Sequence, residues 1–188
     1  MDKKPSYDIL RFQVPCKLEY TKLVEEITDH ICSYVRMDKN RSFSQKLRAV
    51  MNEVFINIVK HSQTAAREEM VRFQFELGLD YFTISIYDYG PGFEADGHFP
   101  PYPKELVGKR FKLREVIDGV VYFTIVNPFE VNFEFEELPE NELDQLDQLA
   151  YLEDHGLGIS IVTKLMDSVS YTYIGSGKFD WKLIKRLD

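Results

Sequence analysis

The chain has 188 residues, and its apolar and aromatic shares, 44% and 14%, are typical of a globular protein and exclude a disordered one. This length suffices for one domain around one sizeable core, and no run approaches the roughly 18 apolar residues of a membrane-spanning helix. The net charge of −8 is unevenly placed, because residues 94–155 hold 15 of the 31 acidic residues and 5 of the 23 basic ones. This acidic block disfavours nucleic acid as a direct partner; it fits either a solvated surface or a basic protein partner.

The N-terminus and the cysteines indicate a cellular compartment. The first ten residues, MDKKPSYDIL, are charged and lack the apolar core of a signal peptide. Cys16 and Cys32 fit no metal-ligand spacing. We therefore expect a reduced, cytoplasmic protein with free thiols and no membrane attachment.

The first third of the chain predicts one strand and two helices. Residues 7–14 favour a short strand that ends at Pro15, and residues 18–35 carry apolar side chains at helical spacing. Ser42 and Gln45 fit a capping box that starts a long helix over residues 44–63. Its apolar face consists of Leu47, Val50, Met51, Val54, Phe55, Ile58 and Val59.

A polar stripe follows one edge of that apolar face. It comprises Glu53, Asn57, Lys60 and Thr64. Helix propensity does not explain Asn57, because asparagine is mildly unfavourable inside a helix. The stripe by itself fits either the rim of a pocket or an ordinary amphipathic helix.

Two strands and a glycine turn come next. Residues 71–77 alternate between apolar and polar, and Phe82, Ile84 and Ile86 form the inward row of the following strand. Asp88 has the same parity, so we expect it at the end of a buried row, where an ionised carboxylate needs hydrogen-bond donors. Residues 89–93, Tyr-Gly-Pro-Gly-Phe, predict a tight turn.

Residues 94–155 predict a structured insertion. The proline-rich residues 99–103 exclude regular secondary structure, and Asp118-Gly119 favours a hairpin between residues 111–117 and 120–126. A third strand is expected near residues 131–135. Leucines 143, 146 and 149 suggest a short acidic helix. We interpret the segment as an insertion with its own small sheet.

The last part of the chain completes the expected fold. Residues 156–158, Gly-Leu-Gly, open a helix that extends to Met166, and two strands flank a turn at residues 175–177. Helices grouped against a mainly antiparallel sheet predict an α+β fold, a two-layer α/β sandwich with the helices on one face. We expect one domain over residues 1–188.

Three segments together resemble the N, G1 and G2 boxes of the GHKL ATPase superfamily, whose ATP site is the Bergerat fold. They are Glu53-x-x-x-Asn57-x-x-Lys60-His61, Asp88-x-Gly90-x-Gly92-Phe93 and Gly156-Leu157-Gly158. The runs NEVFINIVKH, DYGPGF and DHGLGISIVTKLMDSVSY look like the anti-sigma-factor serine/threonine kinase family. Each glycine pair alone is weak evidence, but the three boxes in order are a specific signal.

The resemblance implies ATP and Mg²⁺ as cofactors and assigns roles to these residues. Asp88 would accept the exocyclic amine of adenine, and Asn57 would offer its carbonyl oxygen to Mg²⁺. Glu53 would be the general base, the catalytic residue that accepts the proton of the attacking hydroxyl. The nucleotide-binding residues it implies are Asn57, Lys60, Asp88, Gly90, Gly92, Phe93, Gly156, Leu157 and Gly158.

Several of these residues have a plainer alternative. Phe93 would wall the pocket or be an ordinary core aromatic, and Lys60 would reach a phosphate or remain solvated. For His61, a hydrogen-bonded core histidine is favoured over a catalytic one. A basic cluster in the insertion would cover a triphosphate or be solvated: Lys104, Lys109, Arg110, Lys112 and Arg114.

The resemblance also implies partners. An anti-sigma-factor kinase would bind a sigma factor, phosphorylate an anti-anti-sigma protein of the STAS type, and could form a homodimer. The region between the second and third boxes is normally much shorter, and acidic groups near a triphosphate would weaken its binding. The alternative is therefore a non-catalytic interaction module of the same fold, in which the acidic insertion binds a partner and ATP turnover is weak or lost.

Overall fold

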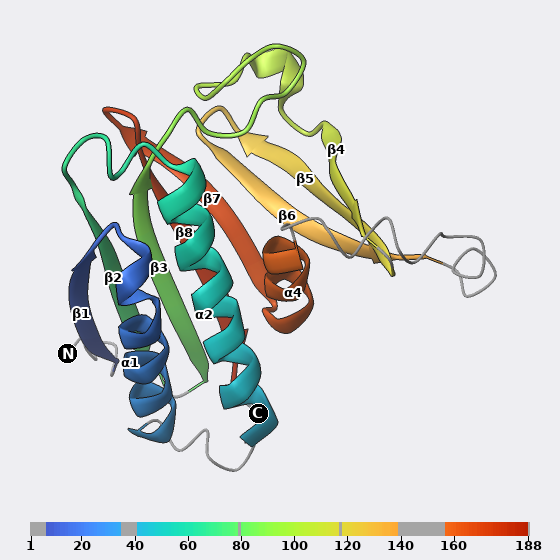
Figure 1. Ribbon diagram of the computed structural model, residues 1–188. Coiled ribbons are helices and arrows are strands. Elements are labelled where there is room, and N and C mark those ends of the chain that lie inside the picture. Colours follow the sequence, from blue (N-terminus) through green and yellow to red (C-terminus); the bar gives the residue numbers. More distant parts are fainter. Residues whose placement is uncertain (1–6, 35–40, 79, 117, 139–156, 188) are drawn as a thin grey trace, which may run out of the picture.

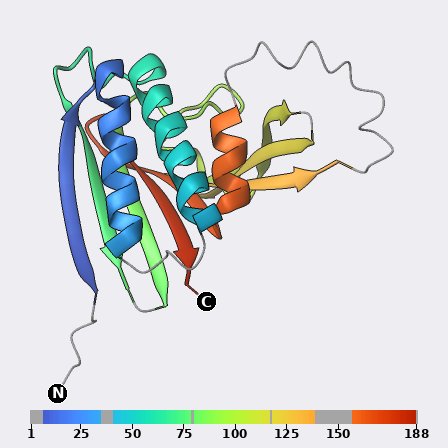
Figure 2. The same cartoon turned by 60° about the horizontal axis from the view of Figure 1, so that its bottom comes forward.

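The computed structural model describes residues 7–34, 41–78, 80–116, 118–138 and 157–187. They form an eight-stranded antiparallel sheet, with strand order β1-β2-β3-β8-β7-β6-β5-β4, and helices that cover one face of it (Figures 1 and 2). The strands are β1 (Asp8–Pro15), β2 (Met70–Leu77), β3 (Tyr81–Tyr89), β4 (Arg110–Val116), β5 (Gly119–Asn127), β6 (Glu130–Glu137), β7 (Ser168–Gly175) and β8 (Lys178–Arg186). The helices are α1 (Thr21–Tyr34), α2 (Arg41–His61) and α4 (Leu157–Leu165), with 3₁₀ turns at Leu18–Tyr20 and Lys104–Leu106. The predicted α+β sandwich is confirmed.

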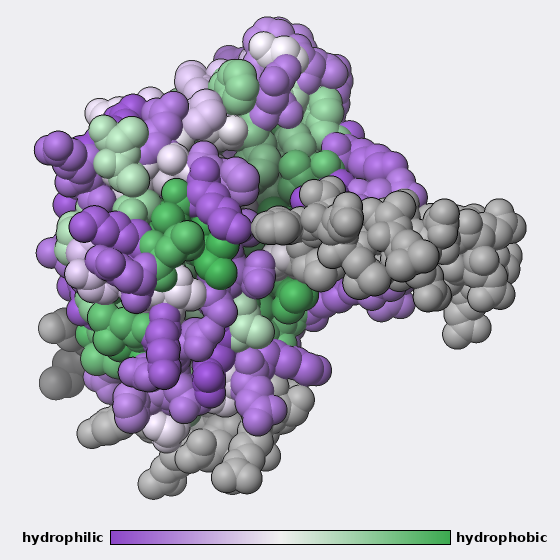
Figure 3. Space-filling view, viewed as in Figure 1, coloured by the Kyte–Doolittle hydropathy of each residue, from purple (hydrophilic) through white to green (hydrophobic). Residues whose placement is uncertain are grey.

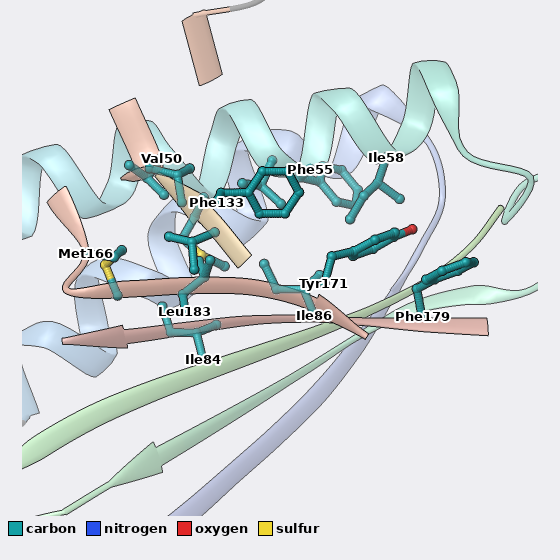
Figure 4. Packing of buried hydrophobic residues seen from close by; sticks show 14 of the residues in the cluster. Val50, Phe55, Ile58, Ile84, Ile86, Phe133, Met166, Tyr171, Phe179 and Leu183 are labelled. Carbon is teal, nitrogen blue, oxygen red and sulfur yellow. The ribbon is translucent and has the colours of Figure 1, made fainter. Parts of the chain in front are cut away.

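The core lies between α2 and the middle of the sheet. Leu47, Met51 and Phe55 of α2 are fully buried, as the predicted apolar face requires. The inward row of β3, Phe82, Ile84 and Ile86, is also fully buried. Figure 4 shows Val50, Phe55 and Ile58 of α2 on one side of this interface, with Ile84, Ile86 and Leu183 of the sheet on the other. Burial of this face fixes the position of α2 over β3, whose inward-facing row ends at Asp88.

The boundaries of α2 differ slightly from the prediction. The helix begins at Arg41, one residue before the proposed cap Ser42, whose side chain lies outside the described residues. It ends at His61, so Thr64 is not on the helical stripe with Glu53 and Asn57. That part of the stripe prediction is wrong, because the chain turns away from the helix before the next helical turn is complete.

The insertion extends the main sheet. The hairpin and the third strand are present as β4, β5 and β6, but β6 pairs with β7 through Val131 and Tyr171 and their neighbours. The expectation of a separate small sheet is therefore wrong. Without β6, one edge of β7 would leave backbone N–H and C=O groups unpaired, and β6 supplies their partners. The expected helix around Leu143 lies outside the described residues.

The helix-bearing side of the molecule is mainly hydrophilic, with smaller hydrophobic areas among the polar side chains (Figure 3). Within the described ranges, no helix has both the length and the apolar character needed to cross a membrane.

Candidate functional site

A cavity of about 400 Å³ opens between α2, α4, β4 and the C-terminal end of β3. This volume lies within the usual span of small-molecule sites, roughly 300 to 1,000 Å³. Its apolar walls come from Val54, Ile58, Leu113, Ile159, Val162, Phe93 and Trp181. Polar groups reach it from Asn57, His61, Ser62, Asp88, Arg114 and Tyr171. Such a largely apolar cavity with a few polar groups suits a ligand with a flat apolar part and a polar end.

Asp88 is the buried acid of the cavity. Only 4% of the residue is exposed, because it continues the inward row of β3. The Tyr171 hydroxyl donates a hydrogen bond of 2.9 Å to Asp88 Oδ1. Burial raises the pKa of Asp88 to about 7, against the opposing hydrogen bonds of Tyr171 and Trp181. The sequence predicts that Asp88 needs a hydrogen-bond donor, and the structure identifies Tyr171 as that donor. The carboxyl group of Asp88 can still accept a hydrogen bond from a ligand.

The turn after β3 needs one of its two glycines for packing. Gly92 has φ +85°, and a Cβ there would lie 2.7 Å from Pro100 Cγ and 2.9 Å from Phe179 Cζ. A Cβ on Gly90 would meet nothing closer than Gly92 N at 3.9 Å. Both glycines line the cavity. Close packing within the protein therefore explains Gly92, whereas for Gly90 close approach by a ligand remains a prediction.

Thr64 anchors this turn. It is fully buried, and its Oγ1 accepts hydrogen bonds from the Tyr89 N–H at 3.0 Å and from the Ser62 hydroxyl at 2.8 Å. The Gln63 N–H also donates to the Tyr89 carbonyl, at 2.6 Å. The segment that follows α2 thus holds the end of β3 in place beside the cavity.

Phe93 both lines the cavity and belongs to an aromatic cluster. Its ring makes edge contacts with Phe133, Tyr171 and Trp181, at centroid distances of 5.1, 5.4 and 5.8 Å. The two interpretations of this residue are therefore compatible. Since Phe133 belongs to β6, the cluster also joins the insertion to the cavity wall.

The start of α4 packs directly against the polar edge of α2. A Cβ on Gly158 would lie 2.9 Å from Asn57 Nδ2 and 2.9 Å from Glu53 Cβ, so only glycine allows this approach. The N–H groups in the first turn of a helix have no partner within it and attract anions. Gly158 is the second residue of α4. The structure therefore places an anion-attracting helix start next to a carboxamide and a carboxylate.

The remaining predicted residues are placed differently. Lys60 is exposed and does not line the cavity, and Glu53 is beside Gly158 but not among the lining residues. His61 is exposed and lines the cavity, so the favoured core-histidine interpretation is wrong. The physical reason is its position as the last residue of α2, beyond the part that packs on the sheet. Gly156 and the side chain of Leu157 lie outside the described residues.

The sequence profile of the histidine kinase-like ATPase domain matches residues 14–179, which run from the end of β1 to the start of β8 and include the insertion. The chain belongs to this family. The GHKL superfamily resemblance is thereby confirmed, and the chain carries an ATP-binding domain. No curated protein matches the chain.

The cavity fits ATP in a histidine kinase-like ATPase domain. A flat base suits the apolar walls beside the buried Asp88, and phosphates suit the start of α4. Among the described residues, no group of three or more His, Cys, Asp or Glu side chains could hold a metal ion. Mg²⁺ does not require one, because it usually binds through one or two protein oxygens together with substrate phosphates. The Asn57 carboxamide, which lines the cavity, has the chemistry of such a ligand.

Other lining residues of this ATPase domain had no role in the nucleotide site assigned from the sequence, and Tyr171 and Trp181 are two of them. Arg114 also lines the cavity; it belongs to the basic cluster for which contact with a triphosphate was one of two alternatives. The alternation of residues 169–173 could have placed Tyr171 on the inward face of its strand. Its pairing with Asp88, 83 residues earlier in the chain, could not be read from that alternation.

Proposed function

We propose that this ATP-binding domain is an Mg²⁺-dependent anti-sigma factor with protein serine kinase activity. It binds a sigma factor and phosphorylates a serine of its STAS-type anti-anti-sigma protein. The runs NEVFINIVKH, DYGPGF and DHGLGISIVTKLMDSVSY support this choice within the superfamily. The structural observation that carries the catalytic part is the packing of Gly158 against both Glu53 and Asn57. In this proposal, the packing brings together the helix start that binds phosphate, the residue that binds the metal and the general base.

Three parts of the cavity bind Mg-ATP in this proposal, and each has one task. Asp88 accepts a hydrogen bond from the adenine amine and so fixes the base in the cavity. The start of α4 donates N–H groups to the phosphates. The Asn57 carbonyl oxygen holds Mg²⁺, which neutralises part of the phosphate charge. Positioning and charge stabilisation are the main contributions that proteins make to phosphoryl transfer.

Glu53 acts on the acceptor. Its carboxylate takes the proton of the serine hydroxyl while the serine oxygen bonds to the γ-phosphorus. The bond between that phosphorus and the β–γ bridging oxygen breaks, and ADP leaves. Glu53 is one helical turn from Asn57, so base and metal ligand face the same region.

Phosphoryl transfer tests the proposal. The protein is incubated with [γ-³²P]ATP, Mg²⁺ and each STAS-domain protein encoded in the same genome. Wild type should label one of them on serine, and Glu53→Ala should lower the rate at least 100-fold, the scale of general-base catalysis. Glu26→Ala is the matched control, because Glu26 lies on α1 and, within the described part of the chain, forms an exposed pair with Lys22. Absence of transfer by a wild-type protein that binds Mg-ATP would refute the kinase activity.

A non-catalytic interaction module remains the second candidate. Two observations favour it: Glu53 is not among the lining residues, and the insertion adds the glutamate-rich strand β6 to the sheet. This candidate predicts calorimetric binding of ATP or ADP without label transfer, together with capture of the sigma factor by the purified protein. Phosphoserine on a STAS protein would eliminate it.

A further inference from the structure

The inference concerns the irregularity in β4. Its pairing with β5 runs regularly from Arg110 to Lys112, which faces Tyr122, and then shifts so that Arg114 faces Val121. Leu113 is skipped, as expected for a β-bulge. The shift reverses the orientation of every later side chain in the strand.

The bulge decides which face Arg114 occupies. Residues that face each other across an antiparallel pair share one face of the sheet. Val121 is fully buried in the core, so Arg114 is on the inner face too. In a regular strand Leu113 would face Val121, and Arg114 would point outward like Arg110. The bulge explains why two consecutive residues, Leu113 and Arg114, both line the cavity.

Arg114 also differs in charge from the other lining residues. Among the described residues that line the cavity, only Arg114 carries a guanidinium group, and no lysine lines it. Lys60, which the sequence suggested for this task, is exposed and outside the lining. A nucleoside triphosphate carries several negative charges, and arginine binds phosphate through paired, charge-assisted hydrogen bonds.

Arg114 and Asp88 line the cavity from different strands, β4 and β3. A guanidinium only donates hydrogen bonds and carries a positive charge. In a bound nucleotide, the anionic phosphates are therefore the groups that suit Arg114 best.

We propose that Arg114 binds the phosphates of the bound nucleotide, so that the bulged strand β4 supplies a phosphate-recognising wall of the site. The inference rests on the proposed nucleotide site and deepens it. The insertion then favours ATP over adenosine, which carries no phosphate.

Calorimetry with ATP and with adenosine tests this role. In wild type, ATP should bind more tightly than adenosine. Arg114→Met should weaken ATP binding about 10- to 100-fold, the span of one hydrogen bond to a charged group, and leave adenosine binding unchanged. Arg114→Lys should retain part of the preference for ATP, because it keeps the charge and loses the paired geometry.

Arg110→Met is the matched control on the same strand. Arg110 pairs with Glu134 and Glu136 on the outer face and stacks on the Tyr122 ring, so its loss should leave both affinities unchanged. Equal ATP affinities for wild type and Arg114→Met would overturn the inference, as would a parallel loss of adenosine binding or a wild type that binds no nucleotide. Loss of phosphoryl transfer alone would refute only the kinase proposal, because these measurements need no acceptor protein.

Discussion

Replacement of Asp88 by asparagine should separate the stability of the protein from its ability to bind nucleotide. Asp88→Asn removes the buried charge and keeps an oxygen that can accept the Tyr171 hydroxyl. The amide nitrogen that replaces the other carboxylate oxygen is a donor, and it cannot accept the adenine amine. We therefore expect a more stable protein at pH 8 that no longer binds ATP.

The pKa of Asp88 sets the size of the effect. Its rise from 3.8 to about 7 on folding corresponds to about 4 kcal/mol. A raised pKa in the folded state means that the folded protein holds the proton more tightly between pH 4 and 7. The associated stability is fully present below pH 4 and is lost as the pH rises through 7. Asp88→Asn lacks this loss, so its advantage over wild type should grow to as much as about 4 kcal/mol at pH 8.

Urea denaturation at pH 5 and pH 8 measures this difference. The unfolding free energy of wild type should fall between the two pH values more than that of Asp88→Asn does. Because both proteins share all other titrating groups, the comparison isolates Asp88. An identical pH dependence in the two proteins would refute the reasoning, and so would a mutant less stable than wild type at pH 8.

Two further predictions concern the same cavity. Gly158→Ala should lower the unfolding free energy by about 1 to 3 kcal/mol and weaken ATP binding, since its Cβ would press on Asn57 and Glu53. Gly90→Ala is the stability control, because its Cβ would meet Gly92 N at an ordinary contact distance of 3.9 Å. Equal denaturation midpoints for the two variants would contradict the packing argument. Adenosine should bind more tightly at pH 8 than at pH 6, because the ionised Asp88 is the stronger acceptor. Adenosine avoids the titration of phosphate groups, and pH-independent calorimetric affinity would show that ionisation of Asp88 plays no part in base recognition.

Much of the fold followed from local patterns. The apolar spacing of residues 47–59 is the buried face of α2, and the alternation that ends at Asp88 is the inward row of β3. Both patterns have a period set by the backbone alone, so neighbouring residues suffice to read them. Local patterns were therefore enough to predict the sandwich and the buried acid, whereas the three boxes were identified by their resemblance to a known superfamily.

The remaining features depend on pairings between distant parts of the chain. Tyr171 became the donor to Asp88 because β7 and β8 set their side chains beside the end of β3. The insertion joined the main sheet because the edge of β7 required partners for its backbone groups. Arg114 reached the cavity because the register with β5 skips one residue; in a regular register it would point outward. Register is set by which strands meet and where, so only the tertiary structure could decide on which side of the sheet that charge lies.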